Sequence, residues 1–164
     1  GVKKLQKSYK KSLHGLKIAS YYGCFLVRPH EVTNFDDPEN PTLMDQLVDS
    51  MGGANVDWPH KVECCGGGLN LTRTDIVVDL SRSIIDSAIS AGADCITVAC
   101  PMCQASLDLR QKDIEKKAGH KYKMPILYIT QLIGLCLGIP GKELGLNRLM
   151  TEPSSIIQAV KAGV

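Results

Sequence analysis

The chain has 164 residues, of which 44% are apolar and 22% are charged. A chain of this length fits one domain and buries about two-thirds of its surface, so we expect it to fold without disulfide support. Its formal charge of +2, from 19 basic and 17 acidic residues, is too close to balance for a dedicated nucleic-acid-binding protein. The composition therefore argues against nucleic acid as a partner.

The first 16 residues form a basic N-terminal segment, which we interpret as a solvated arm, with a helix face or a docking surface as the alternatives. Residues 18–27 are apolar but are interrupted by Tyr21, Tyr22 and Gly23, as in a strand and unlike a signal peptide. The longest apolar run, residues 124–138, is shorter than the roughly 20 residues that a membrane span needs. We therefore expect no membrane span and a cytoplasmic location.

Strand-like and helix-like patterns alternate along the chain. Strands are expected at residues 16–22, 55–58, 95–99 and 126–129. Helices are expected at 42–51 with Thr42 as cap, at 72–92 with a capping box Thr72-x-x-Asp75, at 102–118, at 131–137, and in short pieces near Gly141 and Ser154, with a loop at 28–41. This alternation predicts an α/β fold with an open, mainly parallel sheet and helices on both faces.

Seven cysteines fall into two groups. Cys95 and Cys136 lie inside apolar runs and are interpreted as core residues. The other five follow expected strands, at the carboxyl edge where open α/β sheets bind ligands: Cys24, Cys64, Cys65, Cys100 and Cys103. An odd cysteine count without a signal peptide indicates a reducing compartment, where clustered thiols serve metal or redox chemistry. We expect the five to converge on one site.

The spacing of these five cysteines narrows the chemistry. Cys100-x-x-Cys103 at a helix start suits a redox dithiol, a zinc half-site or an iron–sulfur half-site. Adjacent side chains such as Cys64 and Cys65 point apart, so each can hold a different atom of a larger cluster. One zinc ion takes four ligands and would leave one cysteine idle. The pattern therefore favours a polynuclear iron–sulfur centre, with a zinc-stabilised docking domain as the alternative.

Several neighbouring residues are candidates for supporting roles. Gly66 and Gly67 can bring main-chain N–H groups close to sulfur, whereas Gly68 suits a flexible turn equally well. Candidates for binding an anionic substrate or balancing cluster charge are Arg28, Lys61 and Arg73, with solvated surface charge as the alternative. His30 and His60 lie near cysteines, and we interpret them as surface or loop residues, with metal ligands or proton donors as the alternative. Trp58 and Phe25 also lie near cysteines, and we interpret them as packing residues.

The cysteine motifs together resemble a known family. Tyr21-Tyr22-Gly23-Cys24, then Cys64-Cys65-Gly66, then Cys100-Pro101-Met102-Cys103 resemble the CCG cysteine-rich domain. The flanking segments 57–59, 68–75 and 104–108 are similar to the C-terminal half of the B subunit of heterodisulfide reductase. The resemblance covers most of the chain beyond residue 16, and its motifs are highly specific as a set. Domain boundaries at 17–150, followed by a C-terminal tail at 151–164, are expected on this basis.

The resemblance implies a non-cubane [4Fe–4S] cluster ligated by the CCG cysteines and used in the reductive cleavage of a disulfide, such as the coenzyme M–coenzyme B heterodisulfide. It also implies partner subunits that carry cubane iron–sulfur clusters and flavin, and a second CCG domain. The chain holds only one copy of the motif and starts at Gly1, so we expect a fragment or a split subunit that is inactive alone. The remaining alternative is a CCG domain of a complex that oxidises succinate, glycolate or lactate. No catalytic residue is assigned.

Overall fold

The computed structural model describes residues 1–162 and contains a four-stranded, all-parallel sheet in the order β2-β1-β3-β4. The strands are β1 (Lys17–Tyr21), β2 (Ala54–Asn55), β3 (Cys95–Val98) and β4 (Ile126–Tyr128). The α-helices are α1 (Val2–Gln6), α2 (Gly23–Val27), α3 (His30–Thr33), α4 (Leu43–Ser50), α5 (Thr74–Ser90), α6 (Pro101–Gln104), α7 (Gln111–Ala118), α8 (Ile129–Cys136) and α9 (Ser154–Ala162). Two 3₁₀ turns, η1 (Gly67–Leu69) and η3 (Leu146–Arg148), and one π-helical turn, η2 (Ala105–Leu109), complete the fold. The α/β fold expected from the sequence is confirmed.

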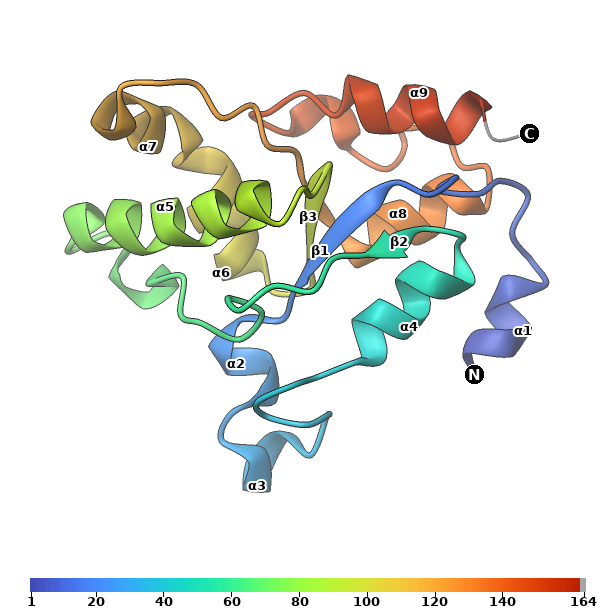
Figure 1. Ribbon diagram of the computed structural model, residues 1–164, viewed down its shortest axis with the longest axis horizontal. Coiled ribbons are helices and arrows are strands. Elements are labelled where there is room, and N and C mark those ends of the chain that lie inside the picture. The colour runs from blue at the N-terminus through green and yellow to red at the C-terminus, as the bar shows by residue number, and fades with distance from the viewer. Residues whose placement is uncertain (163–164) are drawn as a thin grey trace.

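Helices cover both faces of the sheet (Figure 1). Ile18 of β1 belongs to a core with α4, α8 and α9, whereas the next residue, Ala19, belongs to a core with α5, η2 and α7. This alternation follows from the two-residue repeat of a strand. All four residues of β3 and four of the five in β1 are buried, as expected for inner strands of a parallel sheet.

Strand register brings the ends of β1 and β3 together. Tyr21 is paired with Val98 in the parallel ladder. Gly23 starts α2 two residues after Tyr21, and Pro101 starts α6 three residues after Val98. Both short helices therefore begin at the same edge of the sheet, which is the edge where the sequence predicted a site.

The N-terminal ends of two helices differ from expectation. The prediction of a capping box at Thr72 is wrong, because α5 begins at Thr74 with no side-chain cap. Arg73 instead holds the Asp75 carboxylate in an ion pair of 2.7 Å. At α4 the Thr42 side chain makes no cap, and the Asp36 carboxylate accepts hydrogen bonds from the N–H groups of Thr42 and Leu43 at 2.8 and 2.7 Å. A loop acid folds back and replaces the cap that local sequence predicted.

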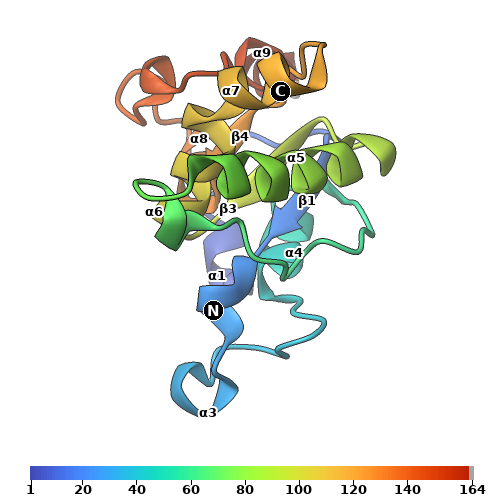
Figure 2. The ribbon, with the colours of Figure 1, turned by 90° about the vertical axis from the view of Figure 1, so that its left-hand side faces the viewer.

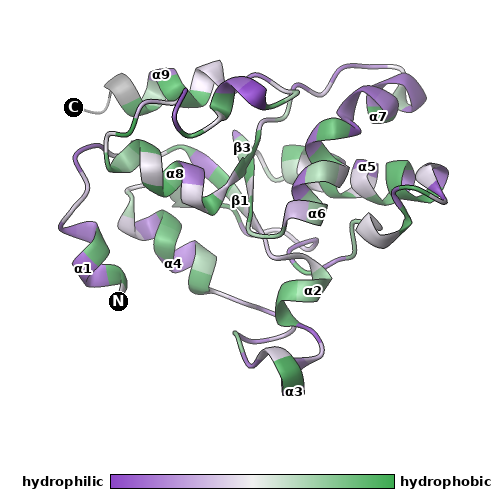
Figure 3. Cartoon of the chain, turned by 180° about the vertical axis from the view of Figure 1, so that it is seen from behind, coloured by the Kyte–Doolittle hydropathy of each residue, from purple (hydrophilic) through white to green (hydrophobic). Residues whose placement is uncertain are grey.

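The expected loop at 28–41 contains a helical turn, α3, which projects from the rest of the fold in both views (Figures 1 and 2). Next to it, α2 carries hydrophobic residues (Figure 3). Phe25 of α2 is 80% exposed, so its interpretation as a packing residue is wrong. The five-residue helix turns Val27 inward and leaves the opposite side without a covering element. By contrast, Trp58 is buried against Tyr21, with ring centroids 6.0 Å apart, as expected.

The expected helix at 102–118 is divided into α6, η2 and α7. A π-helical turn inserts an extra residue and rotates the helix that comes after it. Asp108, within η2, is buried, and its carboxylate accepts hydrogen bonds from the backbone N–H groups of Met150 and Thr151 at 2.9 and 3.0 Å. Ile156 and Val160 of α9 are buried in the core beside α8. The C-terminal segment is thus fastened to the sheet domain at two points.

Among the described residues 1–162, no helix combines the length and the apolar character that crossing a bilayer requires.

Candidate metal centre

The five cysteines of the predicted site lie on loops and helix starts at the carboxyl edge of the sheet. Cys24 lies in the first turn of α2, directly after β1, and Cys100 precedes α6, which contains Cys103. Cys64 and Cys65 lie in the segment between β2 and η1. All of them are free thiols. Segments far apart in the sequence therefore supply one group of thiols.

Side-chain contacts join these sulfurs in two groups, one of Cys65, Cys103 and Cys100 and one of Cys24 and Cys64. The Sγ atoms of Cys65 and Cys103 are 3.6 Å apart. Cys103 also interacts with Cys100, and Cys24 interacts with Cys64. Cys65 and Cys103 are each only 4% exposed, whereas Cys64 is exposed. The site thus has a buried floor and an open rim.

Thiolate character is unevenly distributed in the buried pair. The hydrogen bond between the two sulfurs lowers the pKa of Cys65 to about 6; burial opposes this shift, and Ser106 and the Gly67 N–H add to it. The same bond, together with burial, raises the pKa of Cys103. Of the two sulfurs, Cys65 is therefore the one that carries negative charge more readily.

Glycines form a close cradle around the sulfurs. A Cβ at Gly23 would lie 2.8 Å from Cys103 Sγ, and the φ of Gly23 is +65°. At Gly67 a Cβ would lie 3.3 Å from Cys65 Sγ, so both glycines leave space that sulfur fills. The Gly66 N–H donates to Cys64 Sγ at 3.3 Å, from a residue whose φ is +72°. Amide donors that point at sulfur stabilise negative charge there.

Two backbone interactions fasten the Cys24 turn to the Cys64–Cys65 segment. The N–H groups of Tyr22 and Gly23 both donate to the Lys61 carbonyl, at 2.9 and 3.1 Å. The Tyr21 hydroxyl donates to the Glu63 carbonyl at 2.6 Å. Burial, and then the nearby sulfurs of Cys103 and three other cysteines, raise the pKa of Tyr21, so it stays a neutral donor. Tyr21 is part of the motif recognised in the sequence, but no role was predicted for its hydroxyl; the need of a buried hydroxyl for a partner was the available signal.

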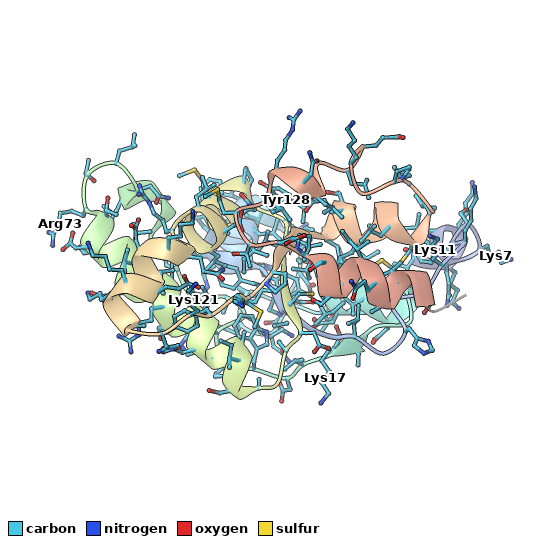
Figure 4. The ribbon with its side chains drawn as sticks, turned by 90° about the horizontal axis from the view of Figure 1, so that it is seen from above. Lys7, Lys11, Lys17, Arg73, Lys121 and Tyr128 are labelled. Carbon is cyan, nitrogen blue, oxygen red and sulfur yellow. The ribbon has the colours of Figure 1, made fainter. Side chains whose placement is uncertain are left out.

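The three candidate cations contact acids in the structure. Arg28 pairs with Glu39 at 2.7 Å and Arg73 with Asp75 at 2.7 Å. Arg73 lies at the outer end of the molecule, far from Lys7 and Lys11 (Figure 4). The ammonium group of Lys61 binds the Asp45 carboxylate at 2.6 Å, and both side chains are largely buried. Their proposed roles in charge balance or substrate binding stay predictions.

The two histidines considered as alternative ligands make their contacts elsewhere in the structure. His60 bonds through Nε2 to the Ser83 hydroxyl at 3.2 Å, and His30 lies in the projecting α3. Cys95 and Cys136 are fully buried in the apolar core, as predicted, and burial raises their pKa values to about 12 and about 11. These two thiols stay protonated and outside the site.

Within residues 1–162, no three Cys, His, Asp or Glu side chains converge as ligands of a single metal ion. The sulfurs are instead distributed in contacting pairs around a glycine cradle. Five soft thiols, with backbone N–H groups that donate hydrogen bonds to them, are too many for one tetrahedral ion. They fit better a group that binds through several iron atoms.

The sequence model of the CCG family, described as a cysteine-rich domain, matches residues 18–108. This range is more than half of the chain and contains all five cysteines. The chain belongs to the CCG cysteine-rich domain family. The resemblance stated from the motifs is confirmed.

Curated relatives of this CCG domain are subunits of oxidoreductases. The chain is 37% identical over 144 residues to the B subunit of Ferredoxin:CoB-CoM heterodisulfide reductase from Methanosarcina mazei, covering 87% of the chain and 48% of that protein. It is 36% identical over 162 residues to the 8-methylmenaquinol:fumarate reductase membrane anchor subunit of Wolinella succinogenes, covering 99% of the chain and 55% of that protein. A protein of Archaeoglobus profundus that is named as similar to the heterodisulfide reductase B subunit is 30% identical over 98% of the chain and 54% of its own length. The chain thus spans about half the length of the curated relatives it matches.

Proposed function

We propose that this CCG domain holds a non-cubane [4Fe–4S] cluster and serves in the reductive cleavage of a small disulfide within a multi-subunit oxidoreductase. The ligands are Cys24, Cys64, Cys65, Cys100 and Cys103. The observation that carries the proposal is the grouping of these five thiols, from three separate segments, at one edge of the sheet. The similarity to the heterodisulfide reductase B subunit supports the choice of reaction.

Residues of this chain prepare the site for such a group. The Gly66 N–H donates to Cys64 Sγ, and the Gly67 N–H helps to lower the pKa of Cys65, so both favour negative charge on sulfur. Buried Tyr21 and Trp58 pack behind the cysteines and keep water from the inner side. When bound, an iron–sulfur cluster supplies one-electron transfer. Cleavage of a disulfide consumes two electrons and two protons and releases two thiols.

An apolar hollow beside Cys100 supports an organic sulfur compound as substrate. It has a volume of about 420 Å³, and its walls include Phe25, Phe35, Ala99 and Pro101. Apolar clefts of this size hold small organic ligands. We propose that the hollow takes the carbon chain of a disulfide, such as the coenzyme M–coenzyme B heterodisulfide, and presents its sulfur atoms at the Cys100 side of the site.

The partners proposed are a second CCG domain and subunits that carry cubane iron–sulfur clusters and flavin. The curated relatives are about twice as long as this chain and are named as subunits of complexes, which supports a larger assembly. Exposed apolar side chains next to cysteines in the sequence, Met102 and Phe25, give a partner a surface to cover. We place the working domain at residues 17–150, between the basic segment 1–16 and the tail 151–164, and propose a cytoplasmic location.

A second candidate is a CCG subunit of a quinol:fumarate reductase type of complex. The 36% identity to the Wolinella succinogenes subunit extends over 99% of the chain, which favours it. Among the alternatives expected from the sequence, this candidate corresponds best to a CCG domain of a complex that oxidises succinate. The zinc-stabilised docking domain, using four of the five cysteines, has less support, because one zinc ion takes four ligands and would leave the fifth thiol unused.

Anaerobic reconstitution of the full chain with iron and sulfide tests the proposal. We expect about four iron atoms per chain, and a loss of iron in Cys24→Ala, Cys65→Ala or Cys103→Ala. Cys95→Ala is the matched control, because this buried thiol lies in the opposite core and should leave iron content unchanged. A folded protein that holds no iron, or one tightly bound zinc, contradicts the proposal.

The reaction class is tested on the reconstituted protein after chemical reduction. Reoxidation by a small disulfide, with release of two thiols per disulfide, supports disulfide cleavage. Reoxidation by a menaquinone analogue, with no response to disulfides, favours the quinol:fumarate reductase type of complex. Electron paramagnetic resonance follows the oxidation state in both cases.

A further inference from the structure

Lys61 is fixed at both of its ends. Its carbonyl accepts hydrogen bonds from the N–H groups of Tyr22 and Gly23, at 2.9 and 3.1 Å. Its ammonium group donates to the Asp45 carboxylate at 2.6 Å and to the Pro41 carbonyl at 3.0 Å. One residue therefore joins the turn that begins α2 to the start of α4.

The ion pair between Lys61 and Asp45 is largely shielded from water. The two side chains are 12% and 18% exposed. A pair that is buried to this extent is screened little by salt, and removal of one partner leaves the other as an uncompensated charge. Asp45 is held in turn, because its carbonyl accepts a hydrogen bond from Asn55 Nδ2 of β2 at 2.9 Å. The ammonium group is thus anchored to α4 and, through it, to the sheet.

The segments that Lys61 joins carry two of the proposed ligands. Cys24 directly follows Gly23, and Cys64 follows Lys61 by three residues. Gly23 also lies against a third thiol, because a Cβ added to it would come within 2.8 Å of Cys103 Sγ. The two N–H groups of the turn share the Lys61 carbonyl as acceptor, so a movement of this carbonyl would free both of them at once.

We propose that Lys61 is a positioning residue, whose ion pair with Asp45 holds the Cys24 turn in a fixed place relative to the Cys64–Cys65 segment. Metal centres depend on such supporting interactions, which orient the ligands without touching the metal. The inference rests on the proposed function in so far as the positioned thiols hold a cluster. It gives Lys61 a role other than charge balance or substrate binding, because its charge is already neutralised by Asp45.

Variants of the full chain, reconstituted with iron and sulfide, test the inference. Lys61→Met removes the ammonium group and leaves Asp45 unpaired, so both the urea midpoint and the iron content should fall. Adding Asp45→Asn to Lys61→Met removes both charges, and the urea midpoint should largely recover. The anchor to α4 stays broken in this double variant, so its iron content should stay low or its electron paramagnetic resonance spectrum should stay altered. Lys61→Arg keeps the ion pair and should lie nearer to wild type in all three measurements.

Amide hydrogen exchange of the metal-free chain, followed by nuclear magnetic resonance, gives a readout that needs no iron. In the double variant the amides of Tyr22 and Gly23 should exchange roughly tenfold faster than in the wild type, or more, because a bond to a charged group no longer holds their acceptor. The Asp94 amide is the internal reference. It donates to the Lys17 carbonyl at 2.7 Å, at the other end of β1, and should keep its rate.

Arg82→Met is the matched control for Lys61→Met. It also removes one positive charge from an ion pair, but the partners Arg82 and Asp86 both lie in α5 and are 40% and 44% exposed. We expect this variant to keep the iron content, the spectrum and the exchange rates of the wild type.

The outcomes separate this inference from the proposed function. A double variant that regains the wild-type urea midpoint together with the wild-type iron content, spectrum and exchange rates overturns the inference, because the ion pair then serves stability alone. A double variant that does not fold overturns it as well, since the pair is then needed for the fold and not for the position of the thiols. A wild type that holds no iron refutes the proposed function, and the exchange rates of the metal-free chain then decide whether Lys61 positions the two segments.

Discussion

The Tyr21 hydroxyl donates a hydrogen bond of 2.6 Å to the Glu63 carbonyl, one residue before the Cys64–Cys65 pair. This bond joins the end of β1 to a segment 42 residues away. Tyr22, the neighbour of Tyr21, is equally buried, but the Tyr22 hydroxyl accepts hydrogen bonds from the N–H groups of Met44 and Asp45 at the start of α4. Two adjacent tyrosines thus perform different tasks, one at the candidate metal centre and one at a helix end.

We expect Tyr21→Phe to disturb the reconstituted cluster more than Tyr22→Phe does. Each variant removes one buried hydroxyl and leaves its partner without a bond, at a cost of about 1–3 kcal/mol. Only Tyr21→Phe frees the backbone beside two proposed ligands, so it should lower iron content or alter the electron paramagnetic resonance spectrum. Equal spectra for the two variants at equal iron content would refute a special role for Tyr21.

Gly23 is expected to be intolerant of a side chain. Its φ is +65°, and an added Cβ would lie 2.8 Å from Cys103 Sγ. Gly23→Ala should lower the free energy of unfolding by about 2–4 kcal/mol, because a left-handed conformation and overpacking both carry a cost. It should also displace Cys103 and reduce iron uptake.

Gly68→Ala is the matched control for Gly23→Ala. An added Cβ at Gly68 meets nothing within 4 Å and its φ is not in the left-handed region. Its free energy of unfolding should stay within about 0.5 kcal/mol of the wild type. Urea denaturation of the three proteins, followed by iron analysis, makes the comparison. Similar losses at both glycines would show that crowding against sulfur is not the cause.

The placement of the five cysteines was predictable because it depends on topology. Parallel strands put their carboxyl ends at one edge, so residues such as Cys24 and Cys100, which directly follow strands, had to lie near each other. The supporting bonds were not predictable in the same way. Tyr21–Glu63 and Asn70–Ser106 join residues 42 and 36 positions apart, and only packing determines which buried hydroxyl meets which carbonyl or amide.

Errors in the prediction also have local physical causes. Thr72 and Asp75 match a capping box, but Arg73 binds the Asp75 carboxylate and the helix starts later. Phe25 was expected in the core because aromatic residues usually pack, yet the helix α2 is too short to be covered on both sides. The exposed phenyl ring beside the apolar hollow became visible only in three dimensions.

Removal of the metal should lead to a specific disulfide. The Sγ atoms of Cys65 and Cys103 are only 3.6 Å apart. Treatment with diamide should therefore link this pair first, as two thiols lose two electrons and two protons to the azo group of the reagent. Differential alkylation and mass spectrometry identify the linked residues.

Cys100→Ser distinguishes the competing pairs in that experiment, because Cys103 also interacts with Cys100. The Cys65–Cys103 link should form at the same rate in this variant, and Cys95 and Cys136 should stay reduced because both are fully buried. A first link between Cys100 and Cys103, or between Cys24 and Cys64, would contradict the expected order.

The C-terminal segment is expected to stabilise the sheet domain although sequence analysis placed it outside residues 17–150. Truncation after Met150 removes Ile156 and Val160, which are buried beside α8, and one of the two N–H partners of the buried Asp108 carboxylate. Loss of two buried aliphatic side chains costs about 3–6 kcal/mol. Deletion of α1 is the control, because this helix contains no buried residue and its loss should cost about 1 kcal/mol or less. Free energies of unfolding in urea decide the point: if the truncated chain were as stable as the chain without α1, residues beyond 150 would be a dispensable tail, and the domain would end where the sequence predicted.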